Sequence, residues 1–191
     1  LYFAPRAMSE TASATAVVWG LALALRPSAR RWETLGGASL LGLSALLRLQ
    51  CGVFCAGLVA ILWARKERRA ALEALLCLAV WGVLYGALDH FTWANAPGAR
   101  FSGWFHSALK YLQFNLIEGK AAGWGTSPWH FYLARLFTSM PALWTAAVVL
   151  ALVAHRRATG VLVLAVAFLA LHSWVPHKEY RFLFPALPLL F

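Results

Sequence analysis

Long apolar runs, most of them ended by a short group of basic residues, constrain this chain more than any other feature. The runs cover residues 7–25, 35–62, 71–88, 137–154 and 159–175. Several approach the roughly 20 residues that an α-helix needs to cross a bilayer. The chain is also 61% hydrophobic and only 13% charged, whereas soluble domains are about half apolar. These features predict an all-α protein, a polytopic transmembrane helical bundle.

The net charge of +10 would suit nucleic acid, but the placement of the basic residues does not. Three clusters directly follow apolar runs: Arg26, Arg30 and Arg31; Arg65, Lys66, Arg68 and Arg69; and Arg156 and Arg157. Charges that anchor membrane proteins on the cytoplasmic side lie at such places. We therefore expect membrane lipids and no nucleic acid as partners, with all three clusters in the cytoplasm.

The run 35–62 must turn back if the first two basic clusters share one side of the membrane. Its 28 residues would extend about 42 Å as a single helix, too long for one crossing, yet each half is short for a full crossing. We predict a bent pair of short helices or a re-entrant hairpin, with "RLQCG" at 48–52 near the apex. The opposite, non-cytoplasmic side then carries Glu10, Asp89, His90 and a long outer loop, 89–136.

Two polar residues interrupt the apolar run at this apex. Arg48 and Gln50 would be costly in lipid, so we expect them to face a protein interior or a water-filled cavity. The alternative is a structural arginine whose side chain reaches the membrane interface. The cysteines, Cys51, Cys55 and Cys77, have no metal-ligand spacing and are predicted to be inert core residues.

The outer loop is too aromatic for a plain connector. Residues 101–118 repeat apolar side chains at helical spacing, with His106, Lys110 and Gln113 on other faces, which predicts a helix lying in the membrane interface. In "GWGTSPWHFYL", 123–133, Ser127 is the expected N-cap and Pro128 the first helical residue. Most aromatic residues here would also suit an interfacial belt.

The stretch "PHKEYRF", 176–182, is the densest polar group of the chain. A charge cluster that simply ends a helix is one interpretation. A binding site is the other, because Lys178 as a point charge and Arg181 as a planar fork suit phosphate. A helix starting after Pro176 would add amide donors, Glu179 would orient a cation, and His177 would donate to an anionic leaving group.

The sequence "HKEYRFLFPALPLL" resembles the signature of the glycosyltransferase family 22 mannosyltransferases, membrane enzymes of the GT-C superfamily. Further matches follow the same order: "LDHFTW" at 88–93, "LQFN" at 112–115 and "GWGTSPWHFYL". The Trp129–His130 pair is most similar to members that add the third mannose of GPI anchors. His90 and Lys110 depart from the family pattern, where Arg and Asn are common.

The resemblance implies an inverting transfer of mannose from dolichyl-phosphate mannose to a lipid-linked glycan, a GPI-anchor or N-glycan precursor, on the lumenal side. It implies the endoplasmic reticulum membrane in a eukaryote, or the inner membrane in a bacterium, and no metal or cofactor. The general base is expected upstream of this chain, with Glu10 and Asp89 as fallback candidates. The substrate-binding candidates are Arg48, Gln50, Trp129, His130, His177, Lys178, Glu179 and Arg181.

Two alternatives stay open at this point. A transporter or lipid-binding membrane protein would also use broken helices and intramembrane arginine, although the chain shows no internal repeat. An inactive structural subunit is the second. Because the chain starts at Leu1 and its last apolar run, 182–191, is short, we expect residues 1–191 to be one fragment of a transmembrane domain that lacks both ends.

Overall fold

The computed structural model describes residues 9–98, 101–139 and 159–189, and this part of the chain is helical without strands, as predicted. The first helices are α1 (Ser9–Ala24), α2 (Arg31–Leu47), η1 (Leu49–Cys51), α3 (Gly52–Ala64) and α4 (Arg68–Trp93). The outer loop contains η2 (Phe101–Gly103), α5 (His106–Leu112), the π-helix η3 (Gln113–Ile117) and η4 (Lys120–Trp124). The C-terminal elements are α6 (Phe131–Ser139), α8 (Thr159–Trp174), η5 (Tyr180–Leu183) and η6 (Leu187–Leu189).

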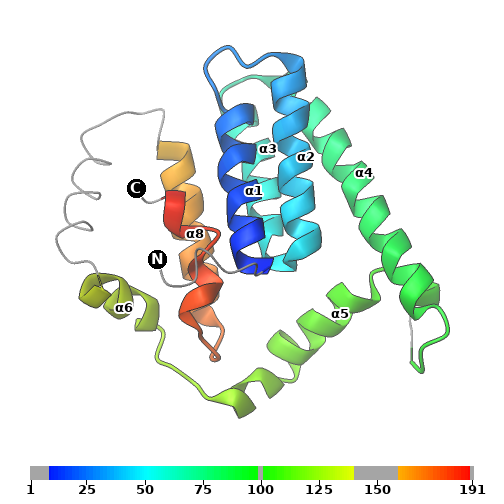
Figure 1. The fold of residues 1–191 in the computed structure, drawn as a ribbon, viewed down its shortest axis with the longest axis vertical. Helices are drawn as coiled ribbons and strands as arrows, with labels where there is room; N and C mark the ends of the chain where they lie inside the picture. The colour runs from blue at the N-terminus through cyan, green and yellow to red at the C-terminus, as the bar shows by residue number, and fades with distance from the viewer. Residues whose placement is uncertain (1–8, 99–100, 140–158, 190–191) are drawn as a thin grey trace.

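The structure confirms the helical hairpin predicted for residues 35–62. Helix α2 ends where Arg48 adopts an extended backbone (φ −146°, ψ 105°), and α3 runs back beside it (Figure 1). Two contacts join the segments at the opposite end of the bundle: Arg65 donates to the carbonyl of Leu25 at 3.1 Å, and Arg31 of α2 pairs with Glu73 of α4 at 3.2 Å. The first two basic clusters therefore share one end of the bundle.

Helices α1 and α2 pack closely because small residues meet at their crossing. A Cβ atom added at Gly37 would lie 2.5 Å from the carbonyl oxygen of Gly20 and 2.7 Å from Cβ of Ala24. Such small-residue contacts are typical of helix pairs in membranes. Helix α8 joins the bundle through Phe168, which is fully buried and stacks on Phe54 of α3 at 4.8 Å. This packing fixes the end of α8 near the hairpin apex.

Among the described residues, α4 is the one helix with both the length, 26 residues, and the apolar composition for a membrane crossing. Its outward face exposes large aliphatic side chains: Leu72, Leu75, Leu76, Val80, Val83, Leu84 and Leu88. Shorter apolar helices cover Leu49–Ala64 and Gly160–Trp174. Most of the run 137–154 lies outside the described residues, as do Arg156 and Arg157.

Three local predictions in the outer part of the chain are wrong. The helix predicted from residue 101 begins only at His106, because Ser102 and Phe105 have left-handed backbones (φ 52° and 57°). Helix α6 begins at Phe131 rather than at Pro128, because a turn precedes it in which the N–H of Phe131 bonds to the carbonyl of Pro128 at 3.0 Å. No α-helix follows Pro176 directly; a short 3₁₀ turn, η5, begins at Tyr180.

Candidate functional site

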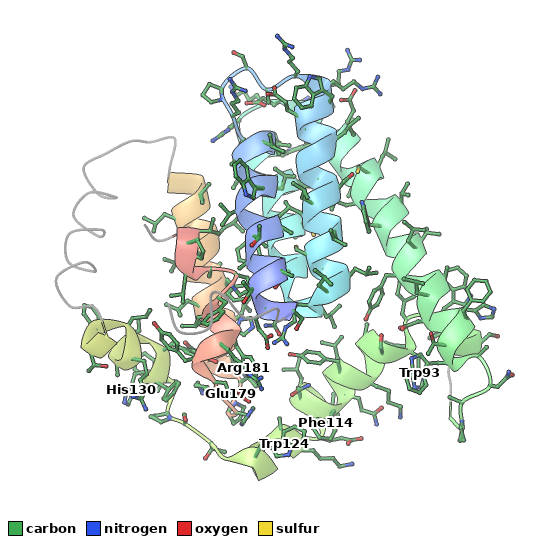
Figure 2. The ribbon with its side chains drawn as sticks, viewed as in Figure 1. Trp93, Phe114, Trp124, His130, Glu179 and Arg181 are labelled. Atoms are coloured by element: carbon green, nitrogen blue, oxygen red, sulfur yellow. The ribbon has the colours of Figure 1, made fainter. Side chains whose placement is uncertain are left out.

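A cleft of about 1760 Å³ lies at the end of the bundle where the hairpin turns. Its walls come from the hairpin apex, from α5 and η3, from residues 124–127 and from the segment that follows α8. Figure 2 shows Glu179 and Arg181 on one side, Phe114 across from them and Trp124 at the lower edge. The basic loops 25–31 and 65–67 lie at the far end of the bundle (Figure 1).

One wall of the cleft carries a network of alternating charges. Arg181 pairs with Glu179, with Nε 2.5 Å from Oε2 and Nη2 3.1 Å from Oε1. Behind this pair, the buried carboxylate of Glu10 lies 3.8 Å from Arg181 and accepts a 2.9 Å hydrogen bond from Arg48. The ring of Phe182 contacts both cations, with centroid distances of 5.5 Å to Arg48 and 5.8 Å to Arg181. The two arginines are thus held side by side.

The acid and the base of the Glu179–Arg181 pair stabilise each other's charged form. Burial alone would raise the pKa of Glu179, but hydrogen bonds from Arg181 and His177 outweigh it and hold this pKa below the ordinary value. The hydrogen bond to Glu179 raises the pKa of Arg181. Both groups are therefore charged at neutral pH.

His177 and Lys178 contact the backbone of the outer loop. The Nδ1 atom of His177 donates to the carbonyl of Gly125 at 3.0 Å, and Nε2 lies 3.2 Å from Oε1 of Glu179. Lys178 donates to the carbonyls of Ser127 and Val175 at 2.9 and 2.6 Å. Burial lowers the pKa of Lys178. Both side chains line the cleft.

The fallback base candidates, Glu10 and Asp89, do not line the cleft. The carboxylate of Glu10 accepts a hydrogen bond from Arg48. Asp89 accepts hydrogen bonds from the backbone N–H and the hydroxyl of Ser107 at 2.8 and 2.7 Å, and these bonds hold α5 against α4. The geometry thus favours a structural role for both carboxylates.

Six of the predicted site residues line the cleft together: Arg48, Gln50, His177, Lys178, Glu179 and Arg181. Gln50 accepts a 3.3 Å hydrogen bond from the hydroxyl of Tyr111, which connects the hairpin apex to α5. Trp129 and His130 are exposed and pack edge to face on each other at 5.5 Å, outside the cleft lining. Trp129 and His130 therefore do not line the cleft with the other six substrate-binding candidates.

Sequence reasoning missed the aromatic and polar wall formed by η3 and η4. The Trp124 ring lies 5.4 Å from Phe114 and meets the edge of His177 at 6.0 Å. Glu118 pairs with Lys120 at 2.7 Å, and both line the cleft. The match "LQFN" marked part of this wall, but apolar periodicity alone did not distinguish it from a belt. The described residues contain no group of His, Cys, Asp and Glu that could hold a metal ion.

The full length of the chain, residues 1–191, matches the sequence profile of the Alg9-like mannosyltransferase family. The chain belongs to this family. The resemblance to glycosyltransferase family 22 is therefore confirmed. No solved structure matches the chain.

Individual members of the Alg9-like family show moderate identity to the chain. GPI mannosyltransferase 3 of Aspergillus fumigatus is 30% identical over 174 residues, 80% of this chain and 21% of the relative. A Dol-P-Man:Man(7)GlcNAc(2)-PP-Dol alpha-1,6-mannosyltransferase of Drosophila melanogaster is 28% identical over 200 residues, 100% of this chain and 27% of the relative. The probable Schizosaccharomyces pombe enzyme of the same name is 28% identical over 130 residues, 64% and 22% of the two chains. The chain thus spans about a quarter or less of these relatives.

Proposed function

We propose that the protein is a mannosyltransferase that moves mannose from dolichyl-phosphate mannose to a lipid-linked glycan, and that the cleft holds the mannosyl phosphate. The relatives act as mannosyltransferases by their names, some on GPI and some on a dolichyl-linked oligosaccharide. The single observation that carries the proposal is the pair Arg48 and Arg181, held side by side on Phe182 at the cleft wall.

The chemistry of the transfer explains why two guanidinium groups suit this wall. An acceptor hydroxyl oxygen forms a bond to the anomeric carbon of mannose, and the bond from that carbon to the phosphate oxygen breaks. The hydroxyl proton leaves to a base, and dolichyl phosphate departs with one more negative charge than it had in the donor. Groups aimed at charge that develops in the transition state are commonly the largest contribution to catalysis. Arginine forks match phosphate oxygens in geometry as well as in charge.

The arrangement of charges also supports a membrane orientation for the proposal. The basic loops after α1 and α3 lie at the end of the bundle opposite the hairpin apex (Figure 1), and the apex residues line the cleft. With the basic end in the cytoplasm, the cleft and the outer loop face the lumen, as in a multi-pass protein of the endoplasmic reticulum membrane. The exposed aliphatic face of α4 would then contact lipid or neighbouring helices.

The test measures mannose transfer from dolichyl-phosphate mannose by the full-length protein in lipid. Removal of the guanidinium in Arg181→Ala should lower kcat about 10²–10³-fold, the usual effect of losing one donor to a developing anion. Arg181→Lys should remain strongly impaired, because a lysine cannot replace a planar fork. Arg69→Ala, at the basic end and 84% exposed in its side chain, is the matched control. Wild-type transfer by Arg181→Ala would refute the proposed role.

A further inference from the structure

Two segments about 50 residues apart are fastened together at the cleft by their backbones as well as their side chains. The N–H of Ser127 donates to the carbonyl of Pro176 at 3.0 Å. In return, Lys178 donates to the carbonyl of Ser127 at 2.9 Å, and His177 donates to the carbonyl of Gly125 at 3.0 Å. We call this set of contacts the loop clamp. It joins residues 125–127 to residues 176–178.

Lys178 is the centre of the loop clamp. Its side chain is buried, and its ammonium group donates to the Val175 carbonyl at 2.6 Å in addition to the Ser127 carbonyl. Two of the three ammonium protons are therefore directed at carbonyl oxygens within the protein. At most one ammonium proton of Lys178 is left for a ligand in the cleft, whereas each arginine of the wall has five N–H donors in all. The geometry points to a different use of this cation.

His177 extends the loop clamp towards the arginine wall. Both of its ring nitrogens face oxygen atoms, those of the Gly125 carbonyl and the Glu179 carboxylate. Glu179 in turn holds Arg181. A continuous path of polar contacts therefore runs from the outer loop to the guanidinium that we assign to the phosphate.

The backbone of the outer loop is adapted to this arrangement. Gly125 has φ 105° and ψ 149°, a conformation that residues with a Cβ rarely adopt. The preceding Trp124 lies edge to face with His177 at 6.0 Å, so the turn at Gly125 presents its carbonyl and this ring to the same histidine.

We propose that Lys178 is a positioning residue: it fastens residues 125–127 against the segment that carries Glu179 and Arg181, and it acts on transfer through this clamp rather than by contact with phosphate. This inference rests on the proposed function, since it assigns a role within the same site. It assigns the "GWGTSP" and "PHKEYRF" stretches to two halves of one structural unit.

Two substitutions separate the donor capacity of Lys178 from its charge. Lys178→Gln keeps two N–H donors but removes the charge. Lys178→Met keeps the approximate length of the side chain but removes the donors as well as the charge. The full-length protein in lipid is followed by hydrogen exchange of the backbone amides in residues 123–130 and by mannose transfer. The exchange measurement needs no substrate, so it tests the loop clamp even if the proposed function fails.

The expected result is that mannose transfer falls in the variants in which amide exchange shows the loop clamp to be weakened. Lys178→Met should speed exchange at the Ser127 amide by about tenfold or more, the factor for losing a hydrogen bond to a charged group, and should lower transfer with it. Lys178→Gln should keep more of the amide protection and more of the transfer activity than Lys178→Met does. Lys66→Met, an exposed lysine at the basic end, should change neither.

The proposal is overturned if amide exchange and mannose transfer do not change together. Unchanged exchange in Lys178→Met would show that the lysine does not hold the loop. Normal transfer with fast exchange would show that the clamp does not matter for the reaction. Loss of transfer in Lys178→Gln with protected amides would show that the positive charge itself acts on the phosphate. If Lys178→Met does not fold, Lys178→Gln decides by the same criterion.

Discussion

The carboxylate of Glu10 lies 2.9 Å from the guanidinium of Arg48, although 38 residues separate them. Glu10 is in the first turn of α1, and Arg48 stands at the break between α2 and α3. The same carboxylate is 3.8 Å from Arg181. One buried acid thus holds the two arginines that we assign to the phosphate, and it joins the start of the bundle to its hairpin apex.

Glu10→Gln should destabilise the full-length protein, because Arg48 would keep its charge in a largely buried place without its partner. We expect a loss of about 2–4 kcal/mol, near the usual effect of breaking a buried ion pair from one side. Thermal unfolding in detergent or lipid measures it. Glu67→Gln, an exposed residue at the other end, should change stability by less than about 0.5 kcal/mol. Equal effects of the two substitutions would contradict a buried Glu10–Arg48 pair.

Gly37→Ala should separate α1 from α2, whereas Gly36→Ala should not. An added Cβ at Gly37 meets the Gly20 backbone at 2.5 Å, while at Gly36 nothing lies within 4 Å. Overpacking of this kind costs about 1–3 kcal/mol, and alanine at an open helical position gains up to about 1 kcal/mol over glycine. The unfolding temperatures of the two variants should therefore move in opposite directions. A lower temperature for Gly36→Ala would mean that another helix covers this face.

Single cysteines should report the orientation of the bundle. In a background without Cys51, Cys55 and Cys77, cysteines at Ser28 and Glu67 should be protected from an impermeant reagent on the lumenal side. Cysteines at Gly123 and Thr126 should react with it. These positions are exposed. Labelling of Ser28 and Glu67 from opposite sides would disprove that the basic loops share one side of the membrane.

The Glu179–Arg181 pair should make stability depend on acid pH. The pKa of Glu179 in the fold is below its ordinary value, so the unfolded chain binds the proton more readily. The charged pair therefore stabilises the fold above the ordinary pKa of about 4.3, and this contribution is lost as the pH falls through the lower folded value. Unfolding temperatures measured from neutral to acid pH should fall less in Glu179→Gln than in the wild type. Parallel curves would contradict a stabilising pair.

Much of the helical framework was predictable because its causes are local. Apolar runs form helices wherever burial or lipid surrounds them, and the polar interruption at Arg48 and Gln50 marks the turn of the hairpin. The charges that gather in residues 177–181 also indicate a site from the sequence alone, since such a group is costly beside apolar runs. These inferences need only the order of residues and the preference of each side chain for water or lipid.

The contacts that define the site depend on distant parts of the chain meeting. Sequence spacing could not show that Lys178 is directed at the Ser127 carbonyl, that Glu10 binds Arg48, or that Asp89 is engaged by Ser107. The late start of α5 at His106 and the π-helix after it likewise oppose the local helical periodicity. The sequence by itself determined that the long apolar runs within the described residues are helical and which segments are charged, because those are local free-energy preferences. The tertiary structure decided which polar groups have partners, because that depends on how helices far apart in sequence pack together.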